Sequence, residues 1–176
     1  MVYYLYSIME NINNKKENKI LYYLENNNLY ILLFNQIMAA SIVSLYNLIE
    51  NDLTKENIIN IYIDFHKCNY IDSTVIGILI KLHNKLKNKN GKLILNNVNN
   101  TILEILKKMG LNNYFNINKD NISGVEEKKY KELYINEDNL PAELILDAHQ
   151  NIIKVSPSMK KEFETLISIL KSQIKK

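Results

Sequence analysis

A buried strand that leads into a helix constrains the fold of this chain more than any other feature of its sequence. Residues Ile58 to Asp64 are mostly apolar and β-favouring, which is typical of a central strand. Residues 65–70 have the composition of a turn, and the apolar spacing from Val75 to about Lys89 predicts a helix. A strand, a short loop and a helix in this order form the repeating unit of an α/β sheet, so the sequence predicts an α/β protein.

Short polar side chains stand at the start of this helix. Asp72 or Ser73 can cap it, because a side-chain oxygen there accepts a hydrogen bond from a free amide of the first turn. The free amides and the helix dipole also favour an added negative charge. Capping alone would account for Asp72, Ser73 and Thr74. A hydroxyl beyond the carboxyl end of a buried strand also lies where open α/β sheets bind partners.

The first two turns of the predicted helix are apolar nearly all round. One apolar stripe must face the sheet, so a second patch near Val75 and Ile76 is covered either by a neighbouring loop or by a partner protein. Gly77 costs the helix about 1 kcal/mol relative to alanine. We therefore expect close packing at Gly77 that leaves no room for a side chain.

Strand and helix patterns alternate along the rest of the chain. The predicted strands are Lys19–Glu25, Leu29–Phe34, Ile58–Asp64, Lys92–Asn97 and Asn113–Ile117; the predicted helices are Ala39–Asn51, Val75–Lys89 and Thr101–Gly110, the last with a capping box formed by Thr101 and Glu104. This order predicts a mixed, mostly parallel sheet of four to five strands with helices packed on it and a C-terminal helical extension.

Composition divides the chain into four parts. Residues 1–18 are expected to be an N-terminal tail in which Met9 is an alternative start, 19–118 a single domain, 119–139 a linker and 140–176 a helical hairpin. In the last helix an apolar seam is formed by Met159, Phe163, Leu166, Leu170 and Ile174. This seam predicts either packing on the protein's own domain or association with a second copy or a partner helix.

The composition argues against several classes of protein. The basic residues comprise 22 lysines and no arginine, and they are scattered, which disfavours a nucleic-acid reader. Cys68 is the only cysteine and there are three histidines, so neither a metal site nor an intrachain disulfide is expected. No apolar run approaches the ~20 residues that span a bilayer. The sequence thus predicts a cytoplasmic protein that binds neither membranes nor nucleic acids.

The residues at the start of the predicted helix resemble a known family. A buried strand ending in aspartate, followed by a short loop and Tyr70-Ile71-Asp72-Ser73-Thr74-Val75-Ile76-Gly77, resembles the STAS domain, the fold of bacterial anti-sigma factor antagonists. Residues 90–95 are similar to the next strand of that family, and 102–111 to its next helix and Gly-Leu stop. The resemblance extends from about Lys19 to Ile117.

The resemblance implies a switch controlled by phosphorylation. In anti-sigma factor antagonists the serine after the aspartate is phosphorylated by an anti-sigma factor that is itself a serine kinase, and a PP2C-type phosphatase removes the phosphate. The unmodified antagonist binds the kinase, and phosphorylation releases it. The phosphorylation site implied here is Ser73, with Thr74 a weaker candidate, and the implied partner-binding surface comprises Asp72, Ser73, Thr74, Val75 and Ile76. No cofactor is implied.

Two departures from the family pattern and two other functions bear on this interpretation. Val75 replaces a glycine that is common in the family, and Met38 stands where the family usually has an aspartate.

One alternative function is that of a STAS module that binds another protein constitutively, as in a stressosome-like assembly or a lipid-transport ATPase, with Ser73 acting only as a cap. The other is an enzyme with Ser73 as nucleophile and His66 or His83 as base. Because the Gly-x-Ser-x-Gly motif is absent, the sequence predicts that the protein is not an enzyme.

Overall fold

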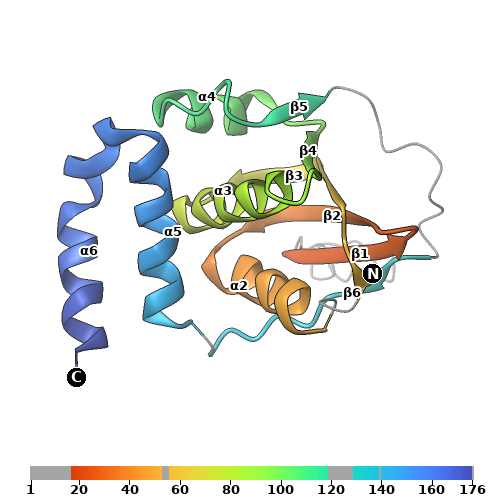
Figure 1. The fold of residues 1–176 in the computed structure, drawn as a ribbon, viewed down its shortest axis with the longest axis horizontal. Coiled ribbons are helices and arrows are strands. Elements are labelled where there is room, and N and C mark those ends of the chain that lie inside the picture. Colours follow the sequence, from red (N-terminus) through yellow and green to blue (C-terminus); the bar gives the residue numbers. More distant parts are fainter. Residues whose placement is uncertain (1–16, 53–55, 119–128, 139, 176) are drawn as a thin grey trace, which may run out of the picture.

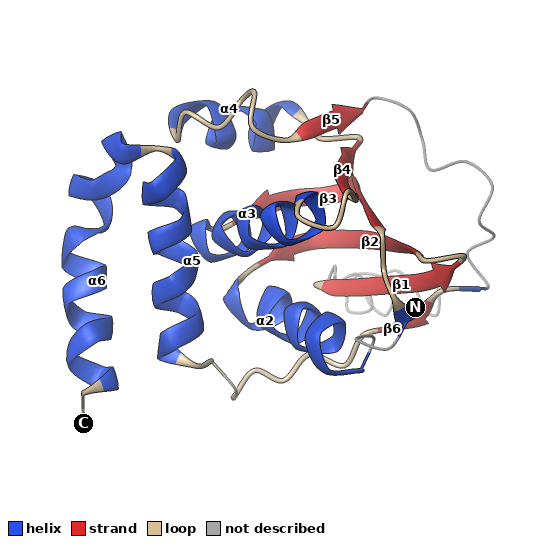
Figure 2. Ribbon diagram, viewed as in Figure 1, coloured by secondary structure: helices blue, strands red, loops and turns tan. Residues whose placement is uncertain are grey.

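The computed structural model describes residues 17–52, 56–118, 129–138 and 140–175. Figure 1 shows one sheet with helices against it, and Figure 2 separates the two kinds of element by colour. The strands are β1 (Lys19–Glu25), β2 (Asn28–Ile37), β3 (Asn60–Ile71), β4 (Lys92–Asn96), β5 (Asn116–Asn118) and β6 (Lys131–Glu132). The helices are α2 (Ala39–Asn47), α3 (Ser73–Lys87), α4 (Asn100–Lys108), α5 (Ala142–Val155) and α6 (Lys160–Ile174). A π-helical turn (Leu48–Asp52) follows α2, and a 3₁₀ turn (Pro157–Met159) joins α5 to α6.

The sheet has six strands in the order β5-β4-β3-β2-β1-β6. β2, β3, β4 and β5 run parallel, whereas β1 is antiparallel to both β2 and β6. The predicted α/β class is therefore confirmed, but the prediction of a mostly parallel sheet of four to five strands is wrong. β6 accounts for the extra strand: it consists of two exposed charged residues inside the stretch expected to be a linker, so it carries no apolar alternation that would reveal it.

Strand β3 is longer than its sequence suggests. It continues to Ile71 through residues 65–70, which were predicted to form a turn. Its far half still pairs with β2, across two shifts of register, and places Phe65 and Cys68 in the core. His66 and Lys67 between them are both exposed, because the shifts of register break the strict alternation, so the stretch resembles a turn when the partner strand is unknown.

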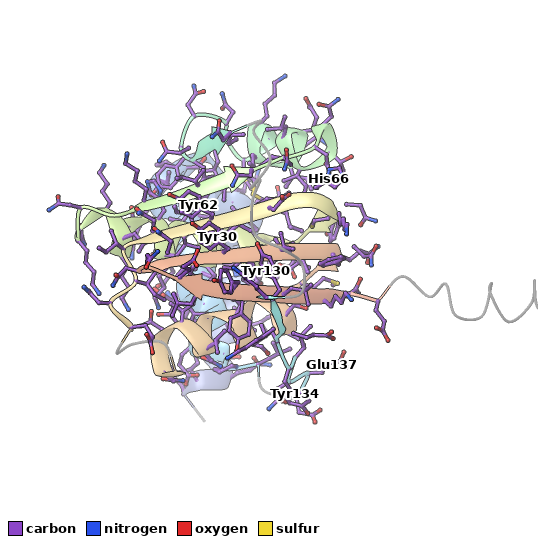
Figure 3. The ribbon with its side chains drawn as sticks, turned by 90° about the vertical axis from the view of Figure 1, so that its right-hand side faces the viewer. Tyr30, Tyr62, His66, Tyr130, Tyr134 and Glu137 are labelled. Carbon is purple, nitrogen blue, oxygen red and sulfur yellow. The ribbon has the colours of Figure 1, made fainter. Side chains whose placement is uncertain are left out.

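The two faces of the sheet differ in their side chains. Ile31, Ile61 and Ile63 point into the core beneath the helices and are fully buried. The opposite face carries tyrosines, among them Tyr30 and Tyr62, which Figure 3 labels on neighbouring strands. Their rings stack across β2 and β3 with centroids 5.1 Å apart. Cross-strand aromatic pairs of this kind stabilise a sheet.

Helix α3 lies in the middle of the molecule. Every residue from Thr74 to Ile80 is buried, because the sheet, α2 and the α5–α6 hairpin all contact this helix. Figure 1 shows the hairpin beside α3 on the side away from β1 and β6. Of the alternatives left open by the apolar seam, packing of the hairpin on its own domain is thus present in the structure.

Two helix ends show how local chemistry sets the boundaries. Helix α4 begins one residue before Thr101, and its cap is the Asn99 side chain, which accepts a hydrogen bond from the Ile102 amide at 3.1 Å. The predicted capping box at Thr101 is therefore wrong by two residues. After α3, Asn90 adopts a left-handed conformation with φ of 59°, which ends the helix in a tight turn.

Candidate functional site

Asp72 joins the starts of two helices. One carboxylate oxygen accepts a hydrogen bond from the Val75 amide at 2.9 Å, which makes Asp72 the N-cap of α3. The other oxygen accepts a hydrogen bond from the Ala39 amide, also at 2.9 Å, at the start of α2. A single carboxylate therefore satisfies free amides of two helices that begin 34 residues apart, and it is fixed in position by both.

This double role compensates for Met38. Met38 occupies the N-cap position of α2, where its side chain makes no capping hydrogen bond, and it is 47% exposed. Asp72 supplies the acceptor that Met38 lacks. Beside this pair lies an open pocket of about 330 Å³ lined by Asp72, Met38 and Leu140 among others. The exposed Met38 and Leu140 give the pocket an apolar rim next to a negative charge.

Ser73 is the first residue of α3, and its hydroxyl contacts a histidine from the C-terminal hairpin. The Ser73 Oγ lies 2.9 Å from His149 Nε2 on α5. The other ring nitrogen, His149 Nδ1, lies 2.8 Å from the carbonyl oxygen of Ile145. Because a carbonyl only accepts hydrogen bonds, Nδ1 must carry the proton, so in the neutral ring Nε2 accepts the hydrogen bond that Ser73 donates.

His149 is held rigidly in this position. Its side chain is 1% exposed, and its ring packs edge-on against Phe163 of α6 with centroids 4.8 Å apart. Both helices of the hairpin thus contribute to placing the imidazole against Ser73. Removing the Ser73 hydroxyl would leave a buried acceptor without its donor.

The contact between α3 and α5 extends along one stripe of α3. Gly77, one turn after Ser73, lies so close to Ala148 that a Cβ at Gly77 would overlap the Ala148 backbone carbonyl. The predicted close packing at Gly77 is therefore confirmed. One turn further, Lys81 Nζ forms an ion pair with Asp147 Oδ2 at 2.7 Å. Burial alone would lower the pKa of Lys81, but the hydrogen bonds to Asp147 and Tyr46 outweigh it and raise the pKa.

The structure places the predicted partner-binding residues unevenly. Asp72 and Ser73 are partly buried, whereas Thr74 is 5% exposed and Val75 and Ile76 have no exposed surface. The apolar patch at the start of α3 is therefore covered by the protein itself. Of the two candidate hydroxyls, only that of Ser73 belongs to a residue with substantial solvent contact.

The histidine beside Ser73 is not one that the sequence suggested. His66 is exposed on β3, and His83 packs against the rings of Tyr114 and Phe115. His149 lies 76 residues after Ser73, so no local spacing could have linked the two. The only hint in the sequence was a polar residue among the apolar positions of the hairpin, next to Ala148.

The described residues contain no group of three or more His, Cys, Asp or Glu side chains that could hold a metal ion. In the same parts of the chain, no helix is both long and apolar enough to cross a membrane.

These features are those of a small α/β protein whose central helix begins at Ser73 and is capped by Asp72. The STAS domain family matches residues 20–123, more than half of the sequence, and the chain therefore belongs to that family. The match covers the sheet from β1 to β5 and includes Asp72 and Ser73. A comparison with curated proteins finds no match.

Among solved structures, similar chains include anti-sigma factor antagonists. SpoIIAA in its unphosphorylated form is 16% identical, with a TM-score of 0.49, and the match covers 57% of this chain and 87% of that one. SpoIIAA of Bacillus in the phosphorylated form is 18% identical, with a TM-score of 0.47 and coverage of 57% and 90%. A putative anti-sigma factor antagonist from Thermotoga maritima is 16% identical, with a TM-score of 0.49 and coverage of 58% and 86%.

Proposed function

We propose that this chain is an anti-sigma factor antagonist whose binding is switched at Ser73. In its unmodified form it binds an anti-sigma factor that is a serine kinase. The kinase transfers the γ-phosphoryl group of ATP to Ser73 Oγ, the hydroxyl loses its proton, ADP leaves, and the complex dissociates. A PP2C-type phosphatase hydrolyses the phosphoserine and restores the binding form. The observation that carries the proposal is the position of Ser73, directly after a fixed Asp72 at the first turn of α3, in a chain of the STAS family.

The electrostatics of this position suit a switch. A phosphate adds about −1.5 to −2 charges and three acceptor oxygens at pH 7. The free amides and the dipole at the start of α3 stabilise such a charge, so the domain itself tolerates it. A partner docked on the same helix end would have to desolvate the phosphate beside Asp72, and it would therefore lose affinity.

Two other functions predict different outcomes. A STAS module that binds its partner constitutively would carry no phosphate on Ser73 or Thr74 under any growth condition, which phosphopeptide mapping from cells would reveal. An acyl-transfer enzyme is suggested by the hydrogen bond between Ser73 and His149. Such an enzyme needs space for a substrate beside the nucleophile, and the pocket that adjoins the site is lined by Asp72 and not by Ser73.

The direct test is phosphorylation by an anti-sigma factor kinase, recovered by pull-down with the unmodified protein and identified by mass spectrometry. We expect wild type to be phosphorylated at Ser73 and Ser73→Ala not to be. Ser73→Ala should stay folded and bind constitutively, and it should lose about 1–3 kcal/mol of unfolding free energy because His149 Nε2 loses its donor.

Thr74→Val is the matched control, since it removes the buried neighbouring hydroxyl while keeping the side-chain shape. It should still be phosphorylated at Ser73. Stoichiometric phosphorylation of Ser73→Ala would move the site to another residue and contradict the proposal.

A further inference from the structure

The hydroxyl proposed as the phosphorylation site forms a hydrogen bond with the chain's own C-terminal hairpin. His149 accepts the hydrogen bond from Ser73, Ala148 lies against Gly77, and Asp147 pairs with Lys81. Ser73, Gly77 and Lys81 are spaced four residues apart and therefore form one stripe along α3. Three consecutive residues of α5 thus contact the stripe that begins at the switch residue.

This arrangement makes Ser73 a poor substrate as it stands. Phosphoryl transfer requires the hydroxyl oxygen in line with the γ-phosphate and a base to remove its proton. The Ser73 hydroxyl is hydrogen-bonded to His149 Nε2, inside a contact that also includes Phe163. A kinase cannot approach Ser73 along this stripe while α5 lies on it.

We propose that the α5–α6 hairpin is an internal competitor for the docking surface at the start of α3, so that the protein binds its kinase only when α5 leaves the Ser73–Gly77–Lys81 stripe. This inference rests on the proposed function and adds to it a regulation that acts before phosphorylation. The apparent affinity for the kinase is the intrinsic affinity reduced by the fraction of molecules in which the hairpin is open. A change on α5 that weakens its contact with α3 should therefore tighten binding.

The contact between α3 and α5 can be weakened at its partly exposed ion pair. Asp147→Lys replaces the ion pair with Lys81 by a repulsion between two lysines. Both side chains of the wild-type pair are about one-third exposed, so the change should not disrupt the core. The matched control is the double variant Lys81→Asp with Asp147→Lys, which restores opposite charges across the same contact.

A second variant acts from inside the contact. Gly77→Ala places a Cβ where the Ala148 carbonyl lies, so α5 must move away from α3. Alanine is otherwise the better helix former, so the substitution does not weaken α3 itself. The two variants open the same contact by unrelated means, and a shared effect is therefore attributable to opening.

The first measurement needs no partner. In hydrogen exchange followed by mass spectrometry on the full chain, we expect the α5 amides of Asp147→Lys and Gly77→Ala to exchange faster than those of wild type. The amides of β2 and β3 should be unchanged, and the charge-swapped double variant should return to wild-type rates. Unchanged α5 exchange in both variants would overturn the proposal, because the contact would then not limit opening.

The second measurement is binding of each full-length protein to the anti-sigma factor kinase recovered in the pull-down, performed with wild-type and Asp147→Lys baits. We expect Asp147→Lys, which changes α5 and leaves the α3 stripe unaltered, to bind about fivefold more tightly than wild type and to be phosphorylated at Ser73 faster. In the complex, α5 should lose its protection from exchange while the start of α3 keeps it.

The possible failures can be told apart. If Asp147→Lys opens α5 but binds no more tightly than wild type, or if α5 remains protected in the complex, the internal competitor is overturned and the proposed function still stands. A pull-down in which neither bait recovers a kinase that phosphorylates Ser73 would overturn the proposed function and this inference with it.

Discussion

At the scale of single residues, His83 and Cys68 show how burial shifts ionisation near α3. His83 lies between the Tyr114 and Phe115 rings, and its buried Nδ1 has no hydrogen-bond partner among the described residues. Burial, assisted by the charge of Lys87, lowers the pKa of His83 below its ordinary 6.5. The folded protein therefore favours the neutral ring.

This shift predicts a loss of stability in mild acid. Below about pH 6.5 the unfolded chain binds a proton at this residue that the folded chain resists, so the free energy of unfolding should fall as the pH falls. His83→Phe should flatten the dependence between pH 7.5 and 5.5, as measured by urea denaturation at each pH. The exposed His66→Ala serves as control and should keep the wild-type slope. An unchanged slope in His83→Phe would contradict the assignment.

Cys68 should be unreactive in the folded protein. Its side chain is 1% exposed, and burial raises the pKa of its thiol from 9.0 to about 11. Only thiolate reacts with disulfide reagents, and two pKa units correspond to about 100-fold less thiolate at pH 8. We expect dithionitrobenzoate to react at least that much more slowly with native protein than with protein in denaturant. Equal rates in native and denatured protein would show that β3 opens readily around Cys68.

At the scale of elements, the turn between α3 and β4 separates two kinds of backbone constraint. Asn90 has a φ of 59°, so its conformation favours glycine. Gly91 has an ordinary φ, but a Cβ there would overlap the carbonyl oxygen of Ile59. Gly91→Ala should therefore cost about 1–3 kcal/mol of unfolding free energy, whereas Asn90→Gly should be neutral or slightly stabilising. Urea denaturation of both variants checks this, and equal effects would refute it.

Elements with local signals could be predicted from the sequence. β1 was predicted with its observed bounds, and the ends of α3 and β4 lie within two residues of those expected. Apolar periodicity and polar caps such as Asp72 are written within a few residues of the element they define. The class of fold and the position of Ser73 depend on these local patterns.

Features that depend on distant partners could not be predicted. The second half of β3 is a strand because β2 pairs with it, and β6 exists because β1 offers an edge. The same holds for the site: Ala39 finds its cap on Asp72, and Ser73 finds its acceptor on His149. Gly77 and the apolar patch at Val75 and Ile76 signalled in advance that something packs closely on α3.

At the scale of the whole molecule, the C-terminal hairpin belongs to the core without being part of the sheet. Ala148, Ile152 and Phe163 join the main hydrophobic cluster. Helix α6 contributes less than α5, since only Phe163 and Leu170 are buried along its length. The hairpin therefore has fewer buried contacts to hold it than β2 or β3, and such segments are the ones that open separately in native proteins.

This unequal anchoring predicts the order in which the molecule opens. Phe163→Ala removes the ring that packs on His149 and should accelerate amide exchange throughout α5 and α6. The amides of β2 and β3 should keep their wild-type rates, because the sheet and α2 still cover their side of α3. Ile169→Ala is the control on the same helix, since its side chain is 51% exposed, and it should change little. Native-state hydrogen exchange with mass spectrometry resolves these segments. If Phe163→Ala accelerated β3 as much as α5, the hairpin and the sheet would unfold as one unit, and the start of α3 could not be uncovered without unfolding the domain.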